Sequence, residues 1–429
     1  MSAPTWPELT RIFGRIGLLS FGGPAAQIAL MHRELVETRP WLDEATYLRA
    51  LSLCMLLPGP EAMQLATYAG WRLRGVAGGL LAGLLFVVPG ALVIALLALG
   101  YAVYGQLPGV QATFLGIKAA VIIVVFQALR KVAGKALVGI QGWGLAMLSF
   151  TGLFVLGLPF PLIILGAGLW GFLASGSGAE TAPPPQGRSA QSGRTLLILG
   201  SLWTAPLLVL WAIDAQFLFE LGLFFAKLAV VTFGGAYAVL AYMTQQVVQD
   251  HGWITTAQMI DALGLAETTP GPLILVTEFV ALLAGYAQAG ISGAIAAGTL
   301  ALWVTFTPCF MWIFLAGPYL DRISAQPRLA GALQAITAAV VGVIANLSIW
   351  FALHVLFDQV LPAQILAVPL PDWQSFNPLA VALTGLSAAL MLWLKRGFVP
   401  TMGVAALVAF GLWLVQTRPP FPSGWIQVW

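Results

Sequence analysis

Charged residues are scarce in this chain: only 8% of its 429 residues are Asp, Glu, Lys or Arg, whereas 59% are hydrophobic. A soluble domain carries about a quarter charged residues, so this chain cannot cover a water-facing surface. Mean hydropathy is +0.91. Apolar runs of about 20 residues, the length that crosses a bilayer, recur along the chain. The sequence therefore predicts an integral membrane protein.

Residues that carry chemistry are also few. Cys54 and Cys309 both lie in apolar stretches, and the three histidines are far apart, so neither a disulfide framework nor a metal site is expected. No phosphate-binding Gly-x-x-x-x-Gly-Lys-Ser/Thr loop and no cluster of nucleophiles occurs. The net charge of +3 is spread over loops, which excludes nucleic acid as a partner. We therefore expect no enzymatic activity and no cofactor.

Thirteen apolar segments form two sets of six around a single one. The first set falls near 10–36, 50–70, 76–104, 111–130, 137–157 and 159–174. The second set falls near 218–245, 257–284, 290–316, 329–357, 377–394 and 398–416. Residues 175–194 are rich in Gly, Ser and Pro, as a flexible linker is. The predicted organisation is a repeat at 1–174, this linker, a connecting segment at 195–213 and a second repeat at 214–429.

One module occurs twice, at Glu8–Pro60 and at Glu220–Pro272, with a constant offset of 212 residues. Of the 53 aligned positions, 18 are identical, and no gap is needed. Each copy contains Phe-Gly-Gly, then a Trp, then Pro-Gly-Pro. Two apolar helices can match through composition alone, but composition does not place these helix-interrupting residues at equal spacing. The two halves are therefore predicted to be homologous.

The number of segments predicts how the copies are oriented. Six segments return the chain to its starting side, and the connecting segment carries it across, so the second copy enters from the opposite face. Many secondary transporters are inverted repeats of this kind, with the substrate site between the repeats near the membrane midplane. Most Lys and Arg residues fall on the side of the N-terminus, so we expect a cytoplasmic N-terminus and linker and a periplasmic C-terminus.

Two interpretations stay open for the segments at 10–36 and 50–70. If both span the membrane, the loop between them places three arginines on the outer side, against the charge rule. That conflict disappears if both are re-entrant hairpins, whose arms of about 10–12 residues reach roughly half-way through a bilayer. The predicted fold class is thus an all-α polytopic integral membrane protein with two inverted homologous halves and broken or re-entrant helices.

The Gly-Gly and Pro-Gly-Pro motifs predict helix breaks inside the membrane, because Gly permits unusual dihedral angles and Pro removes an N–H donor. Broken backbone at that depth is tolerated only where protein buries it or where it lines a wet cavity. Pro also suits the first turn of a new helix, whose N-terminus attracts anions. The alternative is a kink that only helps packing. The candidate substrate-binding residues at the breaks are Phe21, Gly22, Gly23, Pro24, Pro58, Gly59, Pro60, Phe233, Gly234, Gly235, Pro270, Gly271 and Pro272.

Two basic residues lie in apolar stretches at matching positions. Arg15 and Lys227 each precede Phe-Gly-Gly by six residues. A charge at the bilayer centre costs at least about 2.5–3.5 kcal/mol, so each needs a partner or a wet cavity. The alternative is that the side chain snorkels to the interface. We predict that both contact the substrate anion; Lys118, which has no aligned mate, is a weaker candidate.

Acidic and hydroxyl residues flank the same breaks. Glu61 follows Pro-Gly-Pro directly, Glu267 precedes the second Pro-Gly-Pro, and Glu278 lies six residues beyond it. Each carboxylate is a candidate for proton coupling. The alternatives are that Glu61 stabilises a helix N-terminus and that one of the others pairs with the basic residue of the second copy. Thr268 and Thr269 add hydroxyl donors and complete the predicted substrate-binding set.

These motifs resemble the chromate ion transporter family in its long, two-domain form. The resemblance rests on Phe21-Gly22-Gly23-Pro24, Trp41, Pro58-Gly59-Pro60 and their second copies, and it covers nearly the whole chain. It implies a multi-pass protein of the bacterial inner (plasma) membrane that exports chromate and confers chromate resistance. Members of the family have homologous halves of opposite orientation. Ala236 stands where the first copy has Pro24, so we expect a softer break there.

We therefore predict a secondary transporter that exports chromate, a tetrahedral oxyanion, driven by the membrane potential or a proton gradient. Backbone donors recognise charge and shape, so sulfate or another oxyanion, in either direction, is the alternative substrate. A membrane assembly partner without transport activity is the alternative from another class, but it leaves the repeated breaks unexplained. The expected partners are the oxyanion and the lipid bilayer, and a homodimer is compatible with the sequence.

Overall fold

The computed structural model describes residues 4–176, 189–233, 236–320, 323, 326–362 and 368–417. Nearly all of them are helical, which confirms the predicted all-α class. Within these ranges, six helical stretches are long and apolar enough to cross a membrane: Glu61–Tyr104, Pro108–Ala136, Gly193–Ala212, Leu273–Tyr319, Pro327–Leu356 and Phe398–Thr417. The prediction of a polytopic membrane protein is thereby confirmed.

The first half consists of α1 (Trp6–Leu19), α2 (Gly23–His32), the π-helix η1 (Arg33–Thr38), α3 (Glu44–Leu56), α4 (Glu61–Tyr104), α5 (Pro108–Ala136), α6 (Gly139–Phe154) and α7 (Phe160–Ala174). The connecting helix α8 spans Ser189–Ala212. It begins inside the predicted linker, of which residues 177–188 lie outside the described residues.

The second half begins with α9 (Gln216–Val231), α10 (Ala236–Thr244), the π-helix η2 (Gln245–Asp250), α11 (Thr256–Ala266), η3 (Leu273–Leu275), α12 (Val276–Ala316), η4 (Gly317–Tyr319) and α14 (Pro327–Leu356). It ends with β1 (Val360–Pro362), β2 (Pro369–Pro371), η5 (Trp373–Ser375), α15 (Pro378–Ala388), η6 (Ala389–Trp393) and α16 (Phe398–Thr417). The antiparallel pair β1–β2 was not predicted from the sequence.

The helix breaks lie where the Gly and Pro motifs predict them: between α1 and α2, α3 and α4, α9 and α10, and α11 and η3. Pro24 occupies the first turn of α2, while Pro60 and Pro272 are the N-caps of α4 and η3. A missing N–H costs nothing at these positions, because the first amides of a helix have no intrahelical acceptor.

Helices α4 and α12 each consist of two antiparallel arms without a loop between them. The backbone leaves the helical region at Arg74 and Gly75 in α4, and at Ala289 and Gly290 in α12. The two glycines have φ values of +65° and +62°, which only glycine adopts easily. Further glycines on both arms allow them to touch backbone to backbone. The predicted segments 50–70 and 257–284 therefore end at these reversals.

The first two helices of each half form a hairpin. In the second half, the ring centroid of Phe217 at the start of α9 lies 6.1 Å from that of Trp253, which follows η2. Phe224, further along α9, lies 6.0 Å from Tyr242 of α10. Each pair sits at a similar distance from the break on both arms, as a hairpin requires. In the first half, an ion pair of 3.8 Å between Arg15 of α1 and Glu34 of η1 joins the two arms in the same way. These contacts favour the re-entrant interpretation over the spanning one.

The backbone repeats with the same offset as the sequence. Each half contains a six-residue π-helix at the same position, although their sequences RELVET and QQVVQD share one residue. After it, the Trp41 N–H donates to the Leu35 carbonyl at 3.0 Å, and the Trp253 N–H donates to the Val247 carbonyl at 2.9 Å. The two copies therefore share local geometry even where their side chains differ.

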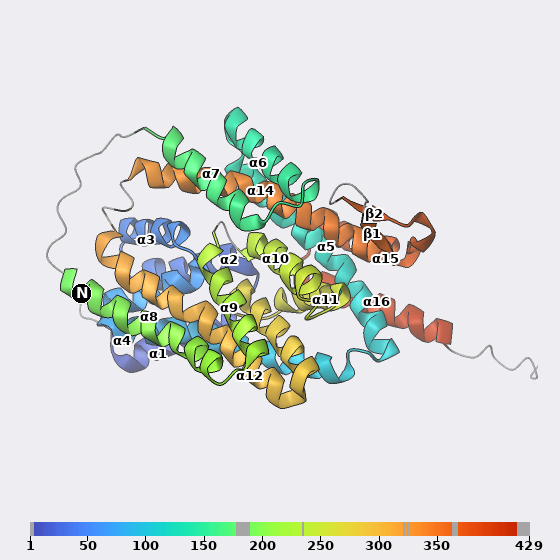
Figure 1. Ribbon diagram of the computed structural model, residues 1–429, viewed down its shortest axis with the longest axis horizontal. Helices are drawn as coiled ribbons and strands as arrows, with labels where there is room; N and C mark the ends of the chain where they lie inside the picture. Colours follow the sequence, from blue (N-terminus) through green and yellow to red (C-terminus); the bar gives the residue numbers. More distant parts are fainter. Residues whose placement is uncertain are drawn as a thin grey trace, which may run out of the picture.

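The later helices of each half pack on the other half. Figure 1 shows α14 running alongside α6 and α7, and α16 lying beside α5. In the centre, α4 packs on α12 and α5 packs on α14. Neither half thus buries its long helices alone, and the two predicted repeats fold as one body of interleaved helices.

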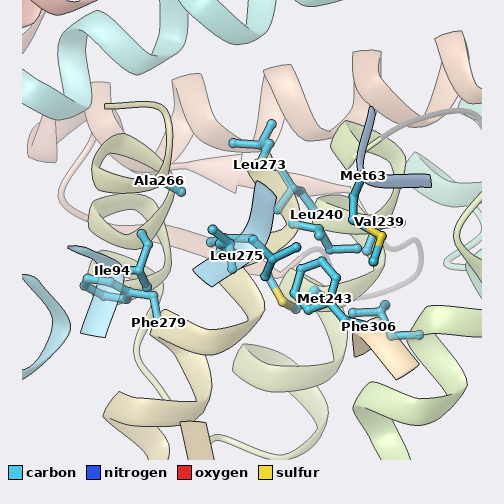
Figure 2. Packing of buried hydrophobic residues seen from close by; sticks show 14 of the residues in the cluster. Met63, Ile94, Val239, Leu240, Met243, Ala266, Leu273, Leu275, Phe279 and Phe306 are labelled. Atoms are coloured by element: carbon cyan, nitrogen blue, oxygen red, sulfur yellow. The ribbon is translucent and has the colours of Figure 1, made fainter. Parts of the chain in front are cut away.

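The largest apolar core joins the two copies at their breaks. Figure 2 shows Met63 of α4 beside Val239 and Leu240 of α10, and Ile94 of α4 beside Phe279 of α12, all of which are buried. Lipid chains are as apolar as these side chains, so close van der Waals packing, rather than transfer out of water, holds the non-helical backbone in place. The core therefore fixes the geometry of the breaks.

Candidate functional site

Backbone hydrogen bonds join the breaks of the two copies in a reciprocal pattern. The N–H of Gly59 donates to the carbonyl oxygen of Thr232 at 2.9 Å, and the N–H of Gly271 donates to the carbonyl oxygen of Ser20 at 3.0 Å. Gly59 and Gly271 are equivalent by the offset of the repeat, and so are Ser20 and Thr232. Each Pro-Gly-Pro motif thus meets the residue before Phe-Gly-Gly in the other copy.

Glycine is required at the centre of both Pro-Gly-Pro motifs. Gly59 has φ +118° and Gly271 has φ +88°, in the region that side chains disfavour. A methyl group added to Gly59 would lie 2.8 Å from Sγ of Cys309, which follows Pro308 in α12. Gly271 lies against Gly90 of α4 in the corresponding way, with Gly90 Cα 3.5 Å from its added methyl group. The two contacts correspond because Gly90 also follows a proline.

A small cavity lies where these breaks meet. Its lining residues are Pro24, Gln27, Gly59, Pro60, Glu61, Ala62, Thr232, Pro272, Leu273 and Ile274. Helices α2 and α4 and the short helix η3 begin here, and none of the three has a side-chain cap. Helix N-termini carry partial positive charge and N–H donors. The cavity volume is about 10 Å³, close to that of one water molecule, so a larger ligand requires the breaks to separate.

Gln27 is a buried polar residue of this cavity that the sequence analysis did not single out. Its Nε2 donates to the carbonyl oxygens of Gly271 at 2.7 Å and Ser20 at 3.2 Å, so one amide joins both copies. Its Oε1 is buried and has no hydrogen-bond partner. Gln64 behaves similarly: its Nε2 donates to the Pro58 carbonyl at 2.7 Å, and its Oε1 is unpartnered. The signal available in the sequence was that Gln27 and Gln64 are polar residues within apolar segments.

Four residues of the predicted substrate-binding set line the central cavity: Pro24, Gly59, Pro60 and Pro272. The candidate coupling residue Glu61 lines it as well. Pro58 and Gly271 bind Gln64 and Gln27 through their carbonyls, and Pro270 packs against Gly90. Gly22 and Gly23 have φ values of +85° and +78° at the start of α2. Phe21 is exposed, whereas Phe233 packs on the core. Gly234 and Gly235 lie outside the described residues.

The two basic candidates lie away from the central cavity. Arg15 is exposed, and its Nη1 lies 3.8 Å from Oε1 of buried Glu34, which also binds Arg39 at 2.6 Å. Lys227 is exposed, and its Nζ lies 5.9 Å from the centroid of the Tyr242 ring. The structure therefore gives each cation a local partner rather than a place among the helix starts.

The two threonines and two of the acidic candidates also do not line the central cavity. The hydroxyls of Thr268 and Thr269 donate to the carbonyls of Leu265 and Ala266 at 2.7 and 2.9 Å, so their protons are already used. Glu267 accepts a hydrogen bond from the Tyr237 hydroxyl. Glu278, in the first turn of α12, is 3% exposed and has one oxygen without a partner. In the described residues neither glutamate pairs with Lys227.

A wider cavity of about 430 Å³ lies between α10, η2, α14 and the β1–β2 hairpin. Its polar lining residues are Thr244, Gln245, Gln249, Asn346 and His354, and Tyr242 contributes its ring. None of its lining residues carries a carboxylate. Tyr242, whose ring centroid lies 5.9 Å from Lys227 Nζ, therefore connects that cation with the wall of this cavity.

The sequence of both halves matches a known protein family. A family model described as chromate transporter matches residues 7–172 and 219–414, which are the two halves without the linker and connecting helix. The chain belongs to the chromate transporter family. The resemblance found in the motifs is thereby confirmed.

Curated relatives in the chromate transporter family cover most of the chain. It is 32% identical over 345 residues to the probable chromate transport protein of Synechococcus elongatus, which covers 79% of this chain and 82% of the relative. It is 31% identical over 371 residues to the chromate transport protein of Cupriavidus metallidurans, with 86% and 88% covered. No solved structure matches.

A shorter relative matches only one half. An uncharacterized transporter of Bacillus subtilis is 32% identical over 171 residues, which is 40% of this chain but 85% of the relative. That protein is therefore about half as long as this one. Within the described residues, no group of three or more His, Cys, Asp or Glu side chains is arranged to hold a metal ion.

Proposed function

We propose that this protein exports chromate from the bacterial cytoplasm and that the anion passes through the central cavity between the breaks. The observation that carries the proposal is the reciprocal pair of hydrogen bonds from Gly59 to Thr232 and from Gly271 to Ser20. They bring three helix starts and the Gln27 amide to one place. Donors gathered at helix N-termini suit a tetrahedral oxyanion, which needs several hydrogen bonds and compensation of its charge.

The contacts of α4 support an inverted arrangement of the halves. At the Arg74 end of its long arm, the Arg74 side chain donates to the carbonyl of Pro4 at the start of the first half. At the other end, Tyr101 donates to Asp261 of α11 in the second half. We infer that the hairpins of the two halves enter the membrane from opposite faces, with the N-terminus cytoplasmic and the C-terminus periplasmic.

Transport requires the central cavity to open alternately to the two sides. Because the breaks are held by two backbone hydrogen bonds and by packing of Gly59 and Gly271, small shifts of the hairpins separate them. Hinges of this kind alternate access around a site near the midplane in inverted-repeat transporters. We infer that the structure corresponds to the closed arrangement between the two open ones.

The membrane potential favours export of a dianion. Moving one charge through 100 mV is worth about 2.3 kcal/mol, so a dianion gains about 4.6 kcal/mol when it leaves a negative interior. Glu61 lines the cavity and would repel an anion when ionised. We propose that a proton on Glu61, with Glu267 and Glu278 as further candidates, accompanies the binding step. Chromate resistance follows if export outpaces entry.

We assign the basic residues a role in collecting the anion. Lys227, over the Tyr242 ring beside the wide cavity, raises the local concentration of anions at that mouth. Arg15 belongs to the corresponding hairpin of the first half and acts at the other mouth. Because Arg15 is paired with Glu34, its net contribution is smaller.

Uptake of labelled chromate into inside-out vesicles tests the proposal. Vesicles that contain the protein should accumulate chromate when the imposed potential makes the lumen positive. Reversal of that potential should reverse the flux. Sulfate is the second candidate substrate, since helix N-termini recognise charge and tetrahedral shape that both anions share. Excess sulfate should therefore compete. Equal chromate uptake by vesicles with and without the protein would contradict transport altogether.

A further inference from the structure

The wide cavity beside α10 is lined by hydrogen-bond donors that have no partner. The side chains of Gln245, Gln249 and Asn346 line it, and none of them makes a hydrogen bond within the described residues. Tyr242 also lines it; this residue is 3% exposed, and in the part of the chain that the structure describes its hydroxyl has no hydrogen-bond partner. Because buried polar groups normally have a partner, the unused hydroxyl points to a ligand in the cavity.

Helix packing brings these donors to one hollow. Gln245 and Gln249 are four residues apart on the π-helix η2, close to one turn, so both face the cavity. Asn346 of α14 completes the group, since α14 packs on α10, the helix that continues into η2. Phe160 at the start of α7 stacks on the Tyr242 ring, with the two ring centroids 5.5 Å apart. The phenol is therefore held in place at the cavity wall.

Two other polar residues of the lining have their protons engaged already. The hydroxyl of Thr244 donates to the Leu240 carbonyl at 2.8 Å. Nδ1 of His354 lies 2.9 Å from the Trp350 carbonyl, to which it donates. The free donors are thus the three amides and the phenol.

The charges around the wide cavity favour an anion. None of its lining residues carries a carboxylate, and Asp250 and Asp358, which adjoin lining segments along the chain, are exposed outside the lining. Lys227 brings a positive charge to the cavity wall, with its Nζ 5.9 Å from the centroid of the Tyr242 ring. A hollow surrounded by one sign of charge concentrates ions of the opposite sign. An amide offers two N–H donors and a phenol one, which an oxyanion can accept.

The two cavities differ in size and lie near the two ends of α10. Thr232, shortly before this helix, lines the central cavity, whereas Ala241 and Thr244 near its end line the wide one. The central cavity of about 10 Å³ holds no oxyanion until the breaks separate. The wide cavity of about 430 Å³ has room for a tetrahedral oxyanion with part of its hydration shell, at about 30 Å³ for each water molecule. It can therefore hold the anion while the breaks are closed.

We propose that the wide cavity is a second binding site for the transported oxyanion, which is held there by the neutral donors of Tyr242, Gln245, Gln249 and Asn346. Conduction needs sites that bind an ion well enough for it to enter and weakly enough for it to leave. Neutral amides and a phenol meet this condition, because they donate hydrogen bonds without a fixed counter-charge. The inference rests on the proposed transport of an oxyanion, but it concerns a cavity apart from the central one.

Equilibrium binding of labelled chromate to the purified protein in a neutral maltoside detergent counts the sites. We expect two chromate ions for each wild-type protein. Gln249→Glu places a negative charge in the wide cavity and should leave one ion. The first copy has Glu37 at the equivalent position of η1, so a glutamate is compatible with this π-helix and the variant should fold. Gln374→Glu, exposed on η5 and outside the lining, is the matched control and should keep two ions.

Two further variants separate the cavities. Asn346→Leu removes one amide from the wide cavity and should weaken one of the two sites by up to about tenfold, as loss of one hydrogen bond predicts. Gln27→Glu adds its charge to the central cavity and should remove the other ion. Two ions bound by Gln249→Glu with unchanged affinity would overturn the inference.

The remaining outcomes distinguish this inference from the proposed function. A single ion that is lost in Gln27→Glu and kept in Gln249→Glu would overturn the second site alone. A single ion with the reverse behaviour would support the wide cavity and overturn the central one. A lipid phosphate has the same chemistry, so binding is repeated with added phosphatidylglycerol: both ions should remain, and displacement of one would assign the cavity to a lipid headgroup and overturn the inference. Absence of chromate binding by the wild type overturns the proposed function and this inference with it.

Discussion

Gly59 donates its backbone N–H to the carbonyl oxygen of Thr232. Thr232 is the repeat equivalent of Ser20, which accepts the reciprocal hydrogen bond from Gly271. The contact joins the Pro-Gly-Pro break of one half to the residue before the Phe-Gly-Gly break of the other. A backbone bond between two non-helical segments satisfies groups that the apolar surroundings cannot. Each break is therefore stabilised by its partner half, and separation of the halves exposes donors from both.

Substitution of the central glycines tests this contact. Gly59→Ala places a methyl group 2.8 Å from Cys309 Sγ and forces alanine to φ +118°, so we expect transport to be largely lost. Strain of this kind costs about 1–3 kcal/mol. Gly271→Ala meets a flexible leucine at 3.1 Å and should cost less. Transport and thermal stability are measured at equal amounts of inserted protein. Gly14→Ala, with nothing within 4 Å, is the control, and normal transport by Gly59→Ala would show that this break serves packing only.

Gln27 provides a test of the cavity itself. Gln27→Leu removes the donor to Gly271 and Ser20 and should weaken transport roughly tenfold, as loss of about 1–1.5 kcal/mol predicts. Gln27→Glu adds a negative charge where the anion is proposed to bind, and should abolish transport. The concentration of chromate at half-maximal flux is the measurement. Gln106→Glu, in the exposed loop after α4, is the matched charge control. Equal effects of the two Glu variants would place the anion elsewhere.

Lys227 tests how the anion reaches the cavity. Lys227→Gln should reduce chromate export and raise the half-saturating concentration, because the charge beside the wide cavity is lost. Lys227→Arg keeps the charge with a different geometry and should retain part of the activity. Tyr242→Phe keeps the ring and serves as a control. Wild-type chromate resistance in cells with Lys227→Gln, at equal protein level, would show that this side chain only extends to the membrane interface and does not act on the anion.

Accessibility of single cysteines tests the hairpins and their orientation. Cys54 and Cys309 are both buried, so the natural background of labelling is low. If the hairpins are re-entrant and the halves inverted, a cysteine at Gln249 reacts with an impermeant reagent from the periplasm, and one at Arg39 reacts only after the membrane is opened. Spanning segments give the reverse pattern. Equal reaction of both from one side would contradict the inversion.

His32 predicts a pH dependence of stability. Its ring bonds Glu44 at 2.7 Å and Glu37 at 3.1 Å, and the hydrogen bond to Glu44 raises the pKa of His32 above its ordinary value. A raised pKa stabilises the folded protein fully below the unfolded value of about 6.5, and this contribution disappears as pH rises through the folded pKa. The melting temperature of wild type should exceed that of His32→Asn at acid pH, and the two should converge at alkaline pH. A constant difference would show that the ring acts by packing alone.

The sequence by itself determined the class, the repeat and the location of the breaks. Low charge and long apolar runs dictate a membrane protein, because no other solvent suits that surface. The breaks follow from the local chemistry of Gly and Pro, which acts without regard to distant residues. The equal spacing of the two copies carried the family resemblance. Local rules of this kind are readable along the chain.

Only the tertiary structure decided which groups meet. The bond between Gly59 and Thr232 depends on two halves interleaving, and nothing in either segment specifies its partner. Gln27 and Asp261 are ordinary polar residues in apolar helices until packing buries them beside the other half. Conversely, Arg15 and Lys227 match in sequence, but helical rotation directs both to the surface. Side-chain direction and the partner across the fold depend on long-range packing, whereas helix breaks depend on the residues at the break.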